Sequence, residues 1–184
     1  MNKVVKFGGS SLADAGQFKK VGAIIHDDSS RRYVIPSAPG KRFPSDIKVT
    51  DMLYQCYAKA VADIDFSELL TAIKDRYQEI IDELQLDLSL DKEFEIISEN
   101  FKNKIGKCYA ASRGEYLNGI VMASYLDFEF IDAADVILFD ENENCMLDET
   151  NELLQERLKG CEYAVIPGFY GRREKKITES GCWV

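Results

Sequence analysis

The sequence predicts an α/β protein built on a mainly parallel sheet. Apolar residues at positions 3–7 and 33–35 favour two short buried strands, and the segment between them has the apolar spacing of a helix. A strand, a helix and a second strand in this order form the unit from which parallel sheets are built. With 184 residues, of which 46% are hydrophobic, the chain is long enough to bury the core of one domain.

The first strand, residues 3–7, runs directly into Gly8 and Gly9, and a helix is expected from about residue 11 to residue 27. Glycines at such a junction let the backbone approach an anion, towards which free N–H groups and the positive end of a helix point. Lys6 adds a full positive charge there. The residues alone leave two interpretations open, a phosphate cradle and an ordinary tight turn.

The second strand, residues 33–35, leads into a loop at 36–42 that is rich in proline and glycine. Open α/β sheets bind ligands beyond the carboxyl ends of their strands. Because this loop and the Gly8–Gly9 turn both follow such ends, we expect them to lie at the same edge of the sheet.

The rest of the chain alternates between predicted helices and short strands. Helices are expected over 50–62, from Asp65 or Ser67 to about 84, over about 91–101, directly after 112–115, and over 151–158; strands are expected over 128–131, 136–139 and 163–166. Thr50 can cap the first of these helices. The long helical stretches contain no cluster of chemically reactive residues, so their acidic side chains are interpreted as solvated faces.

The composition excludes several classes of function. A net charge of −9 argues against a nucleic-acid-binding or acidic-membrane surface, although a local positive pocket could still hold a nucleotide. Five cysteines without a Cys-x-x-Cys pair, and a single histidine, argue against a zinc site and favour reduced thiols in the cytoplasm. The sequence has no stretch of 18 consecutive apolar residues, so a transmembrane segment is not expected.

Four segments, in order, resemble the aspartokinases of the amino acid kinase family. They are Lys6-Phe7-Gly8-Gly9-Ser10-Ser11, then Ser37-Ala38-Pro39-Gly40 with Val49-Thr50-Asp51-x-Leu53, then Ser112-Arg113-Gly114-Glu115, and last Val165-Ile166-Pro167-Gly168-Phe169-Tyr170-Gly171. Together they span almost the whole chain. The resemblance implies a three-layer α/β/α fold with a mainly parallel sheet, of which this chain would form the N-terminal, substrate-side part with a helical insert.

The resemblance also implies a reaction, the phosphorylation of the β-carboxylate of L-aspartate by ATP with Mg²⁺ bound through the nucleotide. The product, 4-phospho-L-aspartate, leads towards lysine, threonine and methionine. The implied site residues are Lys6 as the catalytic contact to the phosphoryl group, Gly8, Gly9 and Ser10 for phosphate, and Ser37, Thr50 and Glu115 for aspartate, with no protein ligand for a metal. Each has a simpler interpretation: Lys6 reaches solvent, Ser37 is a turn residue, Thr50 is a cap, and Glu115 is an acid in the first turn of a helix.

The chain departs from the family pattern in several places: the segment between Gly40 and Thr50 is longer than in many members, and Ala134 stands where many members carry arginine. Asp51 replaces the more usual asparagine, and the family's arginine–glycine segment does not follow Gly171. We therefore expect residues 1–184 to be a truncated amino-acid kinase domain, with a helical insert at about 50–105, a divergent tail at about 177–184 and no regulatory domains. Association of copies through an exposed sheet edge is expected.

Two alternatives to an active aspartate kinase stay open. One is an inactive fragment that lacks the nucleotide-binding half, and the other is a related enzyme that acts on glutamate or on uridylate. In either case we expect no nucleic-acid or membrane partner.

Overall fold

The computed structural model describes residues 1–173 and contains a four-stranded parallel sheet. Its strands are, in spatial order, β1 (Lys3–Phe7), β2 (Arg31–Pro36), β5 (Ala164–Val165) and β3 (Glu129–Phe130). Every pairing between them is parallel, which confirms the expected fold class. A smaller parallel pair joins β4 (Leu138–Phe139) to β6 (Arg172–Arg173). The expected tail at 177–184 lies outside the described residues.

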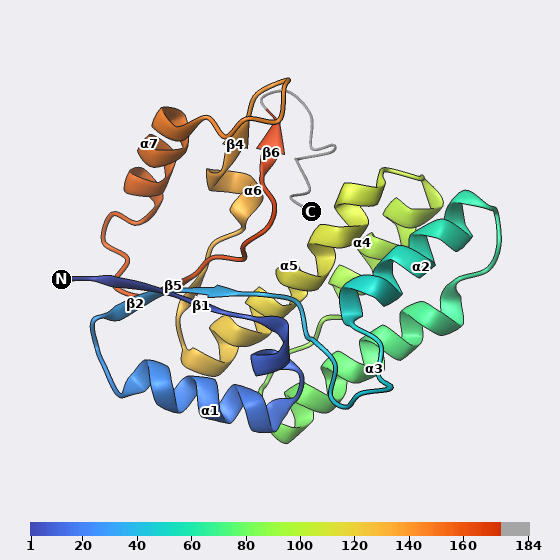
Figure 1. The fold of residues 1–184 in the computed structure, drawn as a ribbon, viewed down its shortest axis with the longest axis horizontal. Coiled ribbons are helices and arrows are strands. Elements are labelled where there is room, and N and C mark those ends of the chain that lie inside the picture. Colours follow the sequence, from blue (N-terminus) through green and yellow to red (C-terminus); the bar gives the residue numbers. More distant parts are fainter. Residues whose placement is uncertain (174–184) are drawn as a thin grey trace.

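Helices cover both faces of the four-stranded sheet (Figure 1). Val34 and Val165 pack into a core shared with α1 (Ala15–His26) and α5 (Lys107–Leu126). The residues on either side of Val165, which are Ala164 and Ile166, pack into a second core with α6 (Ala133–Val136) and α7 (Leu147–Arg157). Since successive side chains of a strand point to opposite faces, the alternation between two cores gives three layers.

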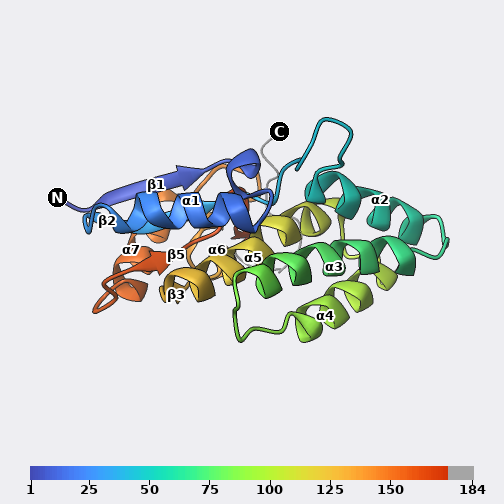
Figure 2. The ribbon, with the colours of Figure 1, turned by 90° about the horizontal axis from the view of Figure 1, so that it is seen from below.

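The other helices form a lobe beside one end of the sheet, and α5 runs from the sheet into it (Figures 1 and 2). The lobe consists of α2 (Val49–Val61), α3 (Ser67–Glu83) and α4 (Asp91–Lys102), whose bounds agree closely with the predicted helices. At its centre the buried Phe101 makes edge-on ring contacts with Tyr57, Phe66 and Tyr109 at centroid distances of 5.9, 5.9 and 6.3 Å. Among the described helices, none has the length and apolar character needed to span a bilayer.

The expected helix start at residue 11 is wrong. Residues Gly9–Leu12 form a short 3₁₀ turn, and α1 begins only at Ala15. The cause is Asp14, whose Oδ1 accepts a hydrogen bond from the backbone N–H of Gln17 at 2.8 Å and so caps α1. The positive end of α1 therefore lies several residues beyond the glycines.

The prediction that residues 112–115 precede a helix is wrong. The segment lies inside α5, which begins at Lys107 after Gly106. Glu115 is accordingly not an acid in the first turn. The expected strand at 136–139 is also shortened. The side chain of Asp132 accepts a hydrogen bond from the N–H of Ala134 at 3.0 Å and starts α6, which leaves only residues 138–139 as a strand.

Candidate functional site

The loops that follow β1 and β2 are in direct contact. The N–H of Gly40 donates to the carbonyl oxygen of Gly9 at 2.8 Å. A Cβ atom added to Gly9 would lie 2.6 Å from the Ala38 oxygen, and one added to Gly40 would lie 2.5 Å from the Gly9 carbonyl carbon. Only glycine at both positions permits this approach, so the predicted neighbourhood of the two loops is observed.

Lys6 and Ser37 lie side by side at this junction. The Ser37 N–H donates to the carbonyl oxygen of Phe7 at 3.0 Å, which continues the β1–β2 pairing beyond the strands. The Lys6 ammonium nitrogen lies 3.5 Å from the Ser37 hydroxyl oxygen. The arrangement places a positive charge and a hydroxyl next to the glycine turn, where both can contact an anion.

Glu115 projects from α5 towards the same junction and is 8% exposed. Its Oε1 accepts a hydrogen bond from the N–H of Ala38 at 3.2 Å, while its Oε2 is buried and has no hydrogen-bond partner among residues 1–173. Burial raises the pKa of this carboxyl, and the Ala38 bond and the charge of Lys6 oppose that rise. A buried carboxylate oxygen without a partner is costly, and a cationic group placed against it would relieve that cost.

Thr50 lies next to the Glu115 turn of α5 and does not cap α2. The N-cap of α2 is Lys48, and no side chain caps it. The Thr50 hydroxyl oxygen is 3.7 Å from the position that a Cβ on Gly114 would occupy. Lys6, Ser37, Thr50 and Glu115 are thus gathered around one junction.

The predicted phosphate-binding residues lie at the start of the 3₁₀ turn. Gly8 precedes the turn, and its carbonyl oxygen accepts a hydrogen bond from the Ser11 N–H at 3.0 Å. Gly9 faces the second loop, and Ser10 is exposed. The glycine turn is therefore adjacent to Lys6, although the helix that was expected to support it is replaced by a single turn.

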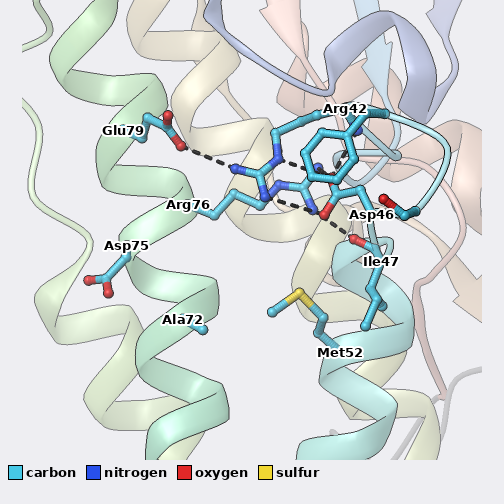
Figure 3. A pocket seen from close by; sticks show the side chains of 10 residues that line it. Arg42, Asp46, Ile47, Met52, Ala72, Asp75, Arg76 and Glu79 are labelled. Carbon is cyan, nitrogen blue, oxygen red and sulfur yellow. Dashed lines mark hydrogen bonds and ion pairs between the residues drawn. The ribbon is translucent and has the colours of Figure 1, made fainter.

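The sequence reasoning did not identify Arg76, which supports the second loop from behind. This arginine of α3 is 4% exposed, and one of its terminal nitrogens donates to the carbonyl oxygen of Gly40. The other donates to the carbonyl oxygen of Ile47 at 2.8 Å, and a carboxylate oxygen of Asp46 lies 3.4 Å from the guanidinium (Figure 3). Arg42 also binds Asp46 at 2.9 Å and holds the pKa of that carboxyl well below its usual range. These contacts fix the loop between residues 40 and 47.

A hollow of about 450 Å³ lies beside this arginine–carboxylate network. Its lining includes Arg42, Asp46, Met52 and Arg76 (Figure 3), and it contains none of the predicted site residues. Both arginines that line it are already paired with the carboxylates of Asp46 or Glu79. Chemically, the junction at Lys6 and Glu115 is therefore the better candidate site.

Asn118 is a second residue that the sequence reasoning missed. It is fully buried on α5, and its Nδ2 donates to the carbonyl oxygen of Ser37 at 2.7 Å. Its position three residues after Glu115 was the available signal, because residues at that spacing lie on neighbouring parts of one helix face.

Comparison with known proteins relates the chain to the amino acid kinases. The model of the amino acid kinase family matches residues 1–183. Aspartokinase 3 of Bacillus subtilis is 36% identical over an aligned length of 183 residues, and the alignment covers 92% of this chain and 40% of that protein. The crystal structure of the aspartate kinase of Clostridium acetobutylicum superposes with a TM-score of 0.93 at 47% identity and covers 98% of this chain.

A more distant match concerns the fold alone. Escherichia coli aspartokinase III, in a complex with aspartate and ADP, gives a TM-score of 0.76 at 20% identity over 98% of this chain. The chain spans 40% to 43% of the length of these three relatives. By its family match and by its fold, the chain belongs to the amino acid kinase family, and within that family it is similar to the aspartokinases.

Proposed function

We propose that this chain supplies the aspartate-binding and phosphoryl-contacting part of a cytoplasmic aspartate kinase. The reaction is the transfer of the γ-phosphoryl group of ATP to the β-carboxylate of L-aspartate, which gives 4-phospho-L-aspartate, the first step towards lysine, threonine and methionine. The single observation that carries the proposal is the gathering of Lys6, Ser37 and Glu115 at one junction, with Glu115 Oε2 unpaired within the described residues.

Lys6 would contact the phosphoryl group. Phosphoryl transfer depends mainly on positioning and on neutralising the charge that spreads over the phosphoryl oxygens. The Lys6 ammonium stands beside the glycine turn, so Gly8, Gly9 and Ser10 would hold the same group through backbone N–H groups and a hydroxyl. Mg²⁺ would enter with the nucleotide.

Glu115 would bind the α-ammonium group of aspartate through Oε2, because Oε1 is already bonded to Ala38. The hydroxyls of Ser37 and Thr50 would donate to a substrate carboxylate.

The four described cysteines are free thiols, which supports the assignment to a reducing compartment.

Calorimetry with L-aspartate tests the binding part of the proposal. We expect the 184-residue chain to bind L-aspartate more tightly than succinate, which has the same carboxylates but no amino group to pair with Glu115. L-Glutamate, which is longer by one methylene, should also bind more weakly. Absence of aspartate binding, or equal binding of succinate, would contradict the proposed site.

A coupled assay of ADP release tests turnover separately. Lys6→Met should lower aspartate-dependent turnover by about 100-fold or more and leave the circular dichroism spectrum unchanged. Lys41→Met is the matched control, because Lys41 is exposed on the neighbouring loop and bonds only to the Pro44 oxygen among described contacts. Turnover with glutamate or uridylate but not with aspartate would assign the chain to another activity of the family, and binding without turnover would limit it to the aspartate-holding role.

A further inference from the structure

Two side chains of α5 hold the opposite ends of one peptide group, the one that joins Ser37 to Ala38. Asn118 Nδ2 donates to its carbonyl oxygen at 2.7 Å, and Glu115 Oε1 accepts from its N–H at 3.2 Å. We call this pair of hydrogen bonds the peptide clamp. Because the C=O and N–H of a trans peptide point in opposite directions, the two bonds together fix both the position and the orientation of its plane.

The close approach of α5 makes the clamp possible. A Cβ on Gly114 would lie 2.7 Å from the Cβ of Ala38, so only glycine there lets the helix pack this tightly against the loop. Glu115 and Asn118 are three residues apart, and such pairs lie next to each other on a helix surface. Their side chains can therefore bracket a single peptide group.

We propose that Asn118 is a positioning residue of the substrate site, acting through the Ser37–Ala38 peptide; this rests on the function proposed above. Donation by Asn118 to the carbonyl polarises the peptide and makes the Ala38 N–H a stronger donor to Glu115. Glu115 Oε1 is thereby occupied, and Oε2 is the oxygen left for a cationic group of the substrate. The same peptide carries the Ser37 side chain, which it holds beside Lys6.

The burial of Asn118 argues for this role and against a purely stabilising one. The residue is fully buried, and its Oδ1 has no hydrogen-bond partner within the part of the chain that the structure describes. An unsatisfied buried acceptor lowers stability, whereas an apolar side chain of similar volume would avoid that cost. Neighbouring positions of α5, such as Leu117 and Val121, are filled with apolar side chains.

The substitution Asn118→Leu removes the donor and the unsatisfied acceptor together. We expect the melting temperature to change little, because removal of the unsatisfied acceptor offsets the loss of the donor to the Ser37 carbonyl; the amide hydrogen of Ala38 should exchange faster, and aspartate should bind about ten-fold more weakly. Asn100→Leu is the matched control, because Asn100 loses a comparable bond, 2.7 Å to the Tyr109 hydroxyl, away from the loop. This control should leave Ala38 exchange and aspartate affinity unchanged.

The readouts separate failure of this inference from failure of the proposed function. If the wild-type chain does not bind aspartate, the proposed function falls, and Ala38 exchange in Asn118→Leu still tests the clamp. Unchanged Ala38 exchange, or unchanged aspartate affinity in a folded variant, would overturn the positioning role. Should Asn118→Leu fail to fold, Asn118→Ala gives the same exchange and affinity test without added bulk.

Discussion

The two sides of the loop after β2 are built differently. On the side of Ser37 and Ala38 the loop faces Lys6 and Glu115, and buried acceptor oxygens of Glu115 and Asn118 lack partners within residues 1–173. On the opposite side, Arg76 donates to carbonyl oxygens of the loop and pairs with Asp46. Only Nε of the Arg76 guanidinium lacks a partner among the described residues.

This difference indicates which side binds a ligand. Unpaired buried acceptors lower stability, so they are expected where a ligand supplies the missing donors. A structural support, by contrast, requires charges that are paired and carbonyl oxygens that accept hydrogen bonds. We therefore interpret the side with the hollow near Arg42 and Met52 as the structural support, and we propose the side with the unpaired oxygens as the substrate site.

The largest expected effect is on folding stability and concerns Arg76, which supports the loop after β2. Arg76→Met should lower the free energy of unfolding by about 3 kcal/mol, because it leaves Asp46 partly buried without its inner partner and frees two loop carbonyls. Urea denaturation measures the change. Arg42→Met, at a more exposed side chain of the same network, should cost less than about 1 kcal/mol. Equal losses in both variants would show that Arg76 is not the main support.

A smaller effect is expected at the site. Glu115→Gln should weaken L-aspartate binding by about 100-fold and remove the preference over succinate, because the ammonium group loses its anionic partner. Since burial disfavours the charged carboxylate, the same variant should be at least as stable as wild type at neutral pH. Calorimetry and thermal melts give both numbers. A retained preference for aspartate over succinate would place the ammonium group elsewhere.

The pH dependence of binding should follow Glu115. Burial raises its pKa in the folded chain, so the carboxylate takes up its proton at a higher pH than an exposed glutamate does, and aspartate affinity should fall as the pH is lowered from neutral, beginning above the range in which an exposed glutamate is protonated. The effect of Glu115 on folding stability runs in the opposite direction to its effect on affinity. Its stabilising contribution is present at low pH and is lost as the pH rises from the unfolded pKa through the raised folded pKa. A titration by calorimetry over this pH range tests the affinity, and thermal melts over the same range test the stability, each with Glu115→Gln as the control. A flat affinity profile in wild type would contradict the first statement, and an identical pH dependence of the melts in both proteins would contradict the second.

The smallest effect is expected for Ser37→Ala. It removes one hydroxyl beside Lys6 and leaves the backbone bonds of the peptide clamp in place, so aspartate should bind about five-fold more weakly with little change in stability. Thr71→Ala, on an outward position of α3, is a suitable control. A loss as large as that of Glu115→Gln would mean that Ser37 contributes more than one neutral hydrogen bond.

Local sequence patterns were sufficient for much of the fold. The parallel strands β1 and β2 and the helices α2, α3 and α4 follow from apolar spacing, and the two loops after β1 and β2 meet as expected. The start of α5 differs from the prediction, because Ser112 and Gly114 are residue types that commonly precede a helix, whereas both lie inside this one. The glycine is needed inside the helix, where Ala38 approaches it.

Local sequence patterns do not predict contacts between distant parts of the chain. Asn118 bonds to a residue 81 positions earlier, and Arg76 to one 36 positions earlier. A buried arginine or asparagine on an amphipathic helix gives no local signal of its partner, since solvated faces carry the same residue types. Those two residues became visible only when the packing of α3 and α5 against the loop was known.

The most direct test is the response of backbone amide signals to L-aspartate in a nuclear magnetic resonance titration. We expect the largest shifts at Ser37, Ala38 and residues 114–118, with little change at residues 42–47 and around Arg76. Shifts centred on the hollow near Arg42 and Met52, with Ala38 and Glu115 unaffected, would contradict it.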